Sequence, residues 1–558
     1  MGIDESVNTG LEQIAVEKPD INTMPFALAG RIVTMAHPNE AKNADDRVVE
    51  DGVIFIEDGV IKAIRKRADG PAPGFEQCPT IETKATLYPG LIDLHNHLSF
   101  NICPLWRVPK LYKNRNEWRT DPDYEANVKG PAQLLAGNLV MAPAMARYVE
   151  AKALANGTTT GQGMRIQGLK GEDVFRGAMR NVEAPNDGRL RGYGAQTHIP
   201  DLNVRSQKEV DTFRTNLEAY RAFFYHLCEG RDEAARQNFL NLEGLDFVKP
   251  SLVGIHALAL TKSDYAKMSA AQAKIVWSPF SNMLLYGSTL NLRDLLDTNN
   301  FPALGCDWSP SGSKGLLEEL KVARWAADSQ FLGDDVTDEN IVQMVTSSAA
   351  LVLGWQDFVG TLQEGRFADI LAIAGTDGDP YTKLVMARER DVQIVAIDGV
   401  PRYGDPQLVR RALAVGLGVD ESDLDVIRID ETQKAFYLRM SNSTLKQLTV
   451  SAATELLQQN VGDLYNLPTA PPSQGIAPMD VEDGFTLVLD DVDGGGSDED
   501  FGQGLAPMAV APPAKSIQLD SFAVDRTHLK AVAQQNNLPQ GLTRYLCECY
   551  GVDLSSLL

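Results

Sequence analysis

Eight short apolar runs with strand character alternate with helical patterns in the middle of the chain, and this alternation limits the possible folds most strongly. The runs occupy residues 87–95, 156–163, 177–185, 191–198, 222–227, 252–258, 273–279 and 302–308. Eight strands with helical crossovers in roughly 280 residues predict an α/β fold with a parallel (β/α)8 barrel of TIM type. The alternative is an open doubly wound sheet. No glycine-rich phosphate turn follows the first run, which argues against a dinucleotide-binding fold.

Two β-rich blocks flank this middle part, and the first contains a Glu-Asp-Gly turn between two runs, which is typical of a hairpin. We expect the blocks, residues 25–85 and 366–410, to form one small β-sandwich domain beside a barrel at 86–365. Residues 1–24 form a polar N-terminal segment, and 411–466 with 517–558 form a mixed, mainly helical C-terminal extension.

Residues 467–516 are rich in Pro, Gly and Asp and predict a linker or a disordered loop. The acidic run within these residues suggests a calcium-binding loop. However, Gly502 occupies the position where an EF-hand loop has its final Glu, which favours a solvated acidic loop.

The composition favours a small-molecule substrate over a polyanionic partner. The formal net charge is −23, and a surface this acidic repels nucleic acid and anionic membranes. The beginning of the sequence has no basic segment followed by an apolar run, and no apolar stretch is long enough to span a membrane. Six thinly spread cysteines are typical of reduced thiols, so we expect a cytoplasmic protein.

Histidine is scarce, with seven residues in the chain, so its placement is informative. His95 and His97 end the first strand-like run in the sequence LIDLHNHL. Side chains two apart in a strand point to the same side, so these imidazoles could chelate a metal. The alternative is a pair of surface histidines at a strand end.

Further polar residues end other runs of the same series. His226 ends the fifth run with Glu229 three residues later, His256 ends the sixth and Asp307 the eighth. Barrel enzymes gather their catalytic groups at these carboxyl ends. Several imidazoles with one carboxylate suit a divalent ion, with zinc preferred and iron or manganese tolerated.

These motifs together resemble the metal-dependent amidohydrolase superfamily over about residues 27–400. They are YPGLIDLHNHL, NGTTT, HLCEG, GIHALAL, WSPFSNMLLYG, GCDWSPSGS and EGRFADILAI. The resemblance is to the single-metal branch that includes cytosine, guanine and S-adenosylhomocysteine deaminases, triazine hydrolases and imidazolonepropionase. No lysine stands at the end of the fourth strand to bridge two metals, which favours one ion per chain.

The resemblance assigns roles to individual residues. It implies four metal ligands: His95, His97, His226 and Asp307. His256 would be a further ligand or contact the water and the substrate, Glu229 would shuttle a proton, and Asp307 would also act as the base. The family often has a histidine where this chain has Trp277, which leaves the contacts to the substrate ring open.

Other assignments remain alternatives. His198 is a second candidate for the fifth-strand ligand, but Glu229 and the interval to His256 favour His226, and His198 would then face the substrate. Further substrate contacts are predicted at polar or aromatic residues near strand ends: Trp106, Arg107, Arg180, Asn181 and Trp308.

The resemblance implies hydrolysis of a non-peptide carbon–nitrogen bond in a small cyclic substrate by a metal-activated water, either deamination or opening of a cyclic amide. Hydrolysis of an ester, a lactone or a carbon–halogen bond is the alternative reaction. An inactive barrel that serves as a scaffold for a partner is the non-enzymatic alternative. Such enzymes are often homodimers, so a homodimer is a further expectation.

Overall fold

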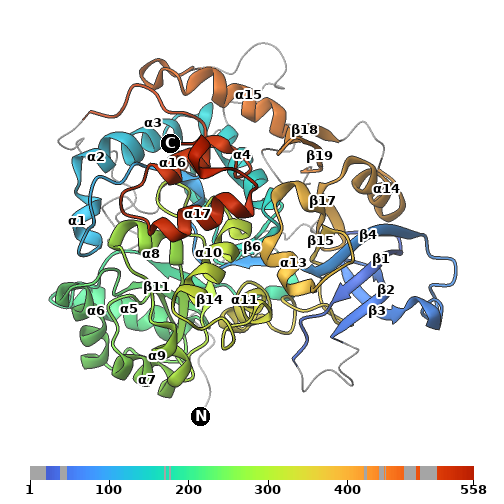
Figure 1. Ribbon diagram of the computed structural model, residues 1–558, viewed down its shortest axis with the longest axis horizontal. Helices are drawn as coiled ribbons and strands as arrows, with labels where there is room; N and C mark the ends of the chain where they lie inside the picture. Colours follow the sequence, from blue (N-terminus) through green and yellow to red (C-terminus); the bar gives the residue numbers. More distant parts are fainter. Residues whose placement is uncertain are drawn as a thin grey trace.

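The computed structural model describes residues 21–37, 47–168, 171–174, 177–185, 187–419, 424–438, 445, 448–469, 485–489 and 512–558. These residues form a mixed α/β structure with one large sheet beside two parallel sheets that are surrounded by helices (Figure 1). No helix in this part of the chain is long and apolar enough to cross a membrane.

All eight predicted runs of the middle segment contain a strand that pairs in parallel. The first sheet contains β5 (Leu91–Asp93), β6 (Thr158–Gly161) and β9 (Arg180–Asn181). The second contains β10 (Gln196–His198), β11 (Phe223–Leu227), β12 (Leu252–His256), β13 (Lys274–Trp277) and β14 (Ala303–Leu304).

Hydrogen bonds connect the edges of these two sheets. At one edge, Ala195 N donates to Val182 O over 2.7 Å; at the other, Asp307 N donates to His95 O over 2.8 Å. Gly305 permits the second approach, because a Cβ at this position would lie 2.5 Å from the backbone nitrogen of His95. Since all the strands run in the same direction, their carboxyl ends lie on one side of the structure.

Helices occupy most of the connections between these strands. Their bounds are α4 (Met141–Ala155), α5 (Gln207–Ala219), α6 (Glu233–Gly244), α7 (Lys262–Ala270), α8 (Pro279–Tyr286) and α9 (Leu292–Asp297), and α10 (Leu316–Ser329) follows the last strand. Side-chain caps fix several of their first turns. Thr261, for example, forms a reciprocal capping box with Asp264 at the start of α7.

The two β-rich blocks meet in one nine-stranded sheet. Its strands are β1 (Phe26–Val33), β2 (Val48–Glu57), β3 (Val60–Lys66), β4 (Thr80–Pro89), β15 (Ile370–Ala374), β16 (Val392–Ile397), β17 (Val400–Gly404), β18 (Asp425–Ile429) and β19 (Thr432–Phe436). The antiparallel pairing of β4 with β15 joins the two blocks. Only Gly90 separates β4 from β5, so this sheet also positions the start of the first parallel strand.

The C-terminal extension combines strands with helices. The hairpin of β18 and β19 adds to the edge of the large sheet beside β17, where Tyr403 pairs with Phe436. The helices of this part are α14 (Pro406–Leu417), α15 (Val450–Asn460), α16 (Arg526–Ala533) and α17 (Gln540–Cys549). In the predicted linker, β20 (Phe485–Val488) pairs with β7 (Arg165–Gly168). The acidic run at 490–500 lies outside the described residues.

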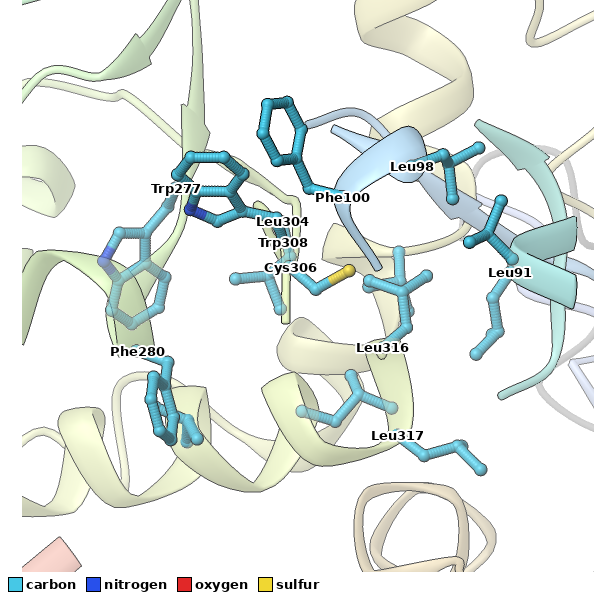
Figure 2. Close-up of a cluster of buried hydrophobic side chains, with 14 of the residues drawn as sticks. Leu91, Leu98, Phe100, Trp277, Phe280, Leu304, Cys306, Trp308, Leu316 and Leu317 are labelled. Carbon is cyan, nitrogen blue, oxygen red and sulfur yellow. The ribbon is translucent and has the colours of Figure 1, made fainter. Parts of the chain in front are cut away.

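Two large hydrophobic clusters support the parallel strands. One contains Ile92, Phe224, Val253, Ile255 and Val276, side chains from four strands that are all fully buried. The other surrounds the strands and extends into the C-terminal helices. Figure 2 shows part of it, with Leu304, Cys306 and Trp308 near Leu316 and Leu317 of α10. Apolar packing thus fixes the strand ends from which the polar residues project.

Candidate metal centre

Four histidines and one aspartate converge where the parallel strands end. The ring centroid of His95 lies 5.0 Å from that of His97, 4.8 Å from that of His226 and 5.0 Å from that of His256. Asp307 Oδ1 lies 3.1 Å from His95 Nε2 and 3.6 Å from His97 Nε2. All five side chains are buried. The structure therefore brings together the residues that the sequence predicts as ligands, together with His256.

The histidine pair after the first strand is placed differently from the expectation. β5 ends at Asp93, so His95 and His97 lie beyond the regular strand. Asn96, between them, forms a parallel bridge with Asp307. The convergence therefore results from pairing with the segment after β14, and not from the pleat of a strand.

The hydrogen bonds of two histidines direct their free nitrogens toward the cluster. His95 Nδ1 faces Gln162 Oε1 at 3.3 Å, and His256 Nδ1 faces Asn282 Oδ1 at 2.9 Å. An amide oxygen only accepts hydrogen bonds, so Nδ1 carries the proton in the neutral ring of each histidine and Nε2 presents a lone pair.

These lone pairs require a positive charge between them. His95 Nε2 and the Asp307 carboxylate face each other at 3.1 Å, which is favourable only with a proton or a cation at that position. The possible ligand atoms of His95, His226 and His256 lie within 4.8 Å of one another, as do those of His95, His97 and Asp307. This set of nitrogens and one carboxylate, with amide oxygens behind it, fits a divalent ion such as zinc.

The protonation states also suit a metal. Burial lowers the pKa of His226 well below the usual value, and Arg115 and the neighbouring histidines lower it further. Burial likewise lowers the pKa of His256. Burial alone would raise the pKa of Asp307, but His95 and the other histidines outweigh it and hold this pKa well below the usual range. Neutral imidazoles and an ionised carboxylate are the forms that bind metal ions.

The backbone is strained at this site. Cys228, His256 and Asp307 have φ angles of 54°, 64° and 64°, in the left-handed region that residues with a Cβ rarely adopt. Each such residue costs about 1–3 kcal/mol, and such strain concentrates at functional sites. Two of the three residues belong to the cluster itself.

Glu229 lies beside the cluster and is held by three side chains. Tyr286 OH donates to Glu229 Oε1 over 2.7 Å, and Trp118 Nε1 donates to the same oxygen over 3.3 Å. Arg115 Nε lies 3.2 Å from Oε2, and His256 Nε2 lies 3.7 Å from that oxygen. Sequence reasoning did not identify Arg115 or Tyr286. The only signal for Arg115 was the loop after the first strand, which is rich in aromatic and basic residues.

The carboxylate of Asp93 supports the backbone segments that carry His95 and Asp307. Cys306 Sγ donates to Asp93 Oδ2 over 2.7 Å, and Asn96 Nδ2 donates to the same oxygen over 2.9 Å. These bonds connect the segment before His95 to the segment before Asp307. Sequence reasoning did not identify Asp93, although it occurs in the same LIDLHNHL motif.

Of the predicted substrate contacts, Trp308 lies nearest to the cluster in the described contacts. Its ring centroid is 5.2 Å from that of His97 and 5.8 Å from that of Trp118. Trp106 is buried, and its Nε1 donates to Asp123 over 2.7 Å, while Arg107 is exposed. Among these three residues, Trp308 is therefore the one whose ring packs on a histidine of the cluster.

The other three predicted contacts have partners of their own. Asn181 is buried, and its Oδ1 accepts a hydrogen bond from Glu183 N over 2.9 Å. Arg180 lies in a buried cluster of aspartates on the side of the nine-stranded sheet. The ring of His198 packs on that of Phe213 at 5.3 Å, outside the histidine cluster. The described geometry gives none of these three a direct contact with the cluster.

Comparison with known proteins agrees with this geometry. The model of the amidohydrolase family matches residues 225–402, which begin in β11 and include His226, His256 and Asp307. Over these residues the chain is similar to the amidohydrolase family.

Curated relatives of this chain are deaminases. A 5-methylthioadenosine/S-adenosylhomocysteine deaminase of Pyrococcus furiosus is 24% identical over 360 residues, which are 59% of this chain and 83% of the relative. A 5'-deoxyadenosine deaminase of Methanobrevibacter smithii is 23% identical over 351 residues, 59% of this chain and 78% of the relative. Deaminases hydrolyse carbon–nitrogen bonds other than peptide bonds, so both relatives belong to that enzyme class.

Solved structures show the same fold. Guanine deaminase of E. coli covers 68% of this chain and 98% of its own length, with a TM-score of 0.52 and 18% identity. A triazine hydrolase from Arthrobacter aurescens covers 70% of this chain and 99% of its own length, with a TM-score of 0.51 and 16% identity. A variant of the atrazine chlorohydrolase from the same species, complexed with zinc and atraton, has a TM-score of 0.50, 17% identity and coverages of 70% and 99%.

Proposed function

We propose that this chain is a metal-dependent deaminase that removes an amino group from a small N-heterocyclic substrate by hydrolysis. The observation that carries the proposal is the convergence of four buried histidines and Asp307, with Glu229 at 3.7 Å from His256. The names of the curated relatives favour deamination over the opening of a cyclic amide, and favour an adenine nucleoside as the first substrate class to test.

One divalent ion would be held by His95, His97, His226 and Asp307. Zinc is the preferred ion, and iron or manganese would accept the same ligands. When bound, such an ion would lower the pKa of a coordinated water from about 16 to about 7 and so make a nucleophile available at neutral pH. His256 directs Nε2 toward the same space, which supports a role as a further ligand or as a contact to the water and the substrate.

Two carboxylates have separate roles in proton transfer: one accepts a proton and the other delivers one. Asp307 is ionised at neutral pH, so it can orient the attacking water and accept its proton. Glu229 can deliver a proton to the leaving nitrogen, which leaves poorly as an anion. Tyr286 and Trp118 fix the orientation of the Glu229 carboxylate, so it needs little rearrangement before it acts. Trp308 would form an aromatic wall for a planar ring beside His97.

We also propose that the eight parallel strands form a closed (β/α)8 barrel over residues 86–365. The hydrogen bonds between the edges of the two parallel sheets support this closure. The blocks 25–85 and 366–410 would form the flanking domain, and 411–466 with 517–558 the C-terminal extension. A β-sandwich form of the flanking domain, a homodimer and a cytoplasmic location remain predictions.

The test combines metal analysis with ammonia release. The purified chain is expected to contain about one zinc, iron or manganese ion and to release ammonia from at least one substrate in a panel. The panel contains 5-methylthioadenosine, S-adenosylhomocysteine, 5'-deoxyadenosine, guanine, cytosine, a hydantoin and a chlorotriazine. His95→Ala should lose both metal and activity, whereas His37→Ala, at an exposed histidine outside the cluster, should keep both.

Other outcomes would replace the proposal. A folded, metal-free chain without hydrolytic activity would favour the scaffold. Ring opening of the hydantoin without ammonia release would favour a cyclic amidase. Release of chloride from the chlorotriazine as the only reaction would favour the carbon–halogen alternative.

A further inference from the structure

The end of the C-terminal extension contacts the segment that follows the first parallel strand. This segment, residues 98–124, contains α1 (Arg115–Arg119) and α2 (Pro122–Tyr124) and supplies two of the side chains around Glu229. Figure 1 shows α16 and α17, in red, on the same side of the molecule as α1 and α2. The contacts of Gln535 and Asn537 with this segment join residues more than 400 positions apart in the chain.

Gln535, just after α16, binds the segment through its backbone. Its Nε2 donates to Trp106 O over 2.9 Å, and its Oε1 accepts from Val108 N over 3.2 Å. The side chain is buried and uses both ends of its amide on this contact. Asn537 adds a third bond, because its Nδ2 donates to Lys110 O over 2.9 Å. One short stretch of the extension therefore holds three alternate residues of the segment.

Asp520 holds the beginning of the same segment. Its backbone N donates to Ile102 O over 2.9 Å. Its carboxylate is buried and bound by Lys314 Nζ, at 2.6 Å, and by Lys152 Nζ. Lys152 Nζ also donates to Asn101 O over 3.0 Å. The buried charge of Asp520 is thus balanced by two lysines, one of which contacts the segment directly.

The other end of the segment contacts Glu229. Arg115 N donates to Glu229 O over 3.0 Å, in addition to the approach of its guanidinium to the carboxylate. Trp118 Nε1 donates to both Glu229 and Tyr286, at 3.3 Å and 2.8 Å. The segment is therefore fixed by the extension at one end and positions the Glu229 carboxylate at the other.

We propose that residues 512–558 form a clasp that positions Glu229 through the segment 98–124, and that Gln535 and Asn537 are positioning residues of this clasp. The clasp gives the extension a role in the activity of the site, and its catalytic consequence rests on the proposed function. A misplacement of about 1 Å at a reacting group can lower a rate about 100-fold, so small movements of the segment matter.

The test compares Gln535→Ala with Gln534→Ala, an exposed neighbour of the same residue type. Hydrogen exchange of residues 98–124 is measured by mass spectrometry, together with metal content, thermal unfolding, kcat and KM. Gln535→Ala should speed exchange in this segment about tenfold or more and lower kcat about tenfold, with little change in KM, because Glu229 acts in the chemical step. Metal content should be unchanged, and Gln534→Ala should behave as the parent chain.

The exchange measurement tests the clasp even if no substrate is found. Exchange in 98–124 equal to that of Gln534→Ala would overturn the clasp. Faster exchange with unchanged kcat would overturn its catalytic role and leave the proposed deamination intact. If Gln535→Ala does not fold, Asn537→Ala, which removes one bond to Lys110, is expected to give the same pattern in smaller degree, and its absence would also count against the clasp.

Discussion

Two buried polar clusters of this molecule are built in opposite ways. In one, Arg180 Nε lies 2.8 Å from Asp369, its Nη2 lies 2.5 Å from Asp398 and its Nη1 lies 3.3 Å from Asp187, and Arg189 contacts two of these aspartates. In the histidine cluster, by contrast, lone pairs of imidazoles face a carboxylate.

The difference separates a structural cluster from a reactive one. Burial alone would raise the pKa of Asp187, but Arg189 and Arg180 outweigh it and lower this pKa, so the cations that this carboxylate needs come from the chain itself. The histidine cluster instead leaves His226 Nδ1 buried without a hydrogen bond to any described residue and keeps two residues with left-handed backbone. Polar groups that do not satisfy one another indicate a site for a further ligand.

The largest effect is expected for Asp307→Asn. The amide keeps the volume but removes the charge that binds the ion and accepts the proton, so kcat/KM should fall about 10²–10⁴-fold. Metal content should fall with it. Asp187→Asn is the matched control in the other cluster and should leave kcat/KM of the folded enzyme unchanged. Full activity of Asp307→Asn would refute the proposed centre.

For Arg180→Met, we expect a loss of stability without a loss of metal or of substrate binding. Its removal leaves Asp369 and Asp398 buried without their main counter-charge, so the free energy of unfolding should fall by about 3–5 kcal/mol in urea denaturation. Metal content and KM of the folded fraction should stay the same. A raised KM with normal stability would instead support the substrate contact that the sequence predicts for Arg180.

A smaller, pH-dependent effect is expected for His198→Phe. Burial, with a contribution from Arg115, lowers the pKa of His198 from 6.5 to about 4. The unfolded chain therefore binds a proton between these pH values that the folded chain does not, and stability falls as the pH falls through this window. At pH 5 this loss is about 2 kcal/mol. In urea unfolding at pH 7 and pH 5, the variant should lose less stability than the parent chain by about this amount. Loss of metal in the variant would instead favour His198 over His226 as the ligand.

The sequence was most informative at the strand ends. A short apolar run that ends in a histidine or an aspartate identifies both the strand and its polar terminus, which is how His226, His256 and Asp307 were found. The partners of these residues come from other elements: Gln162 lies 67 positions from His95, and Asn282 lies 26 positions from His256. No local pattern encodes such pairs, because they depend on how the strands are packed.

The extension and Arg180 also show that a local sequence pattern does not reveal contacts with distant elements. The sequence predicts a mainly helical extension, whereas residues 425–436 form the hairpin of β18 and β19, because their pairing with β17 depends on the edge of a distant sheet. Arg180 was predicted to contact substrate because it lies near a strand end. Its side chain pairs with Asp369 and Asp398 from the second β-rich block, which sequence reasoning did not connect with it.

The joint between the large sheet and the first parallel strand has a consequence for biosynthesis. Tyr88, at the end of β4, donates a hydrogen bond over 2.6 Å to Pro380 O, which is 292 positions later in the chain. At about 5–20 residues per second, a ribosome needs tens of seconds to make this stretch. His95 and His97 follow Tyr88 closely, so we expect the ion to be captured late, after most of the polypeptide has emerged and its two distant halves have joined.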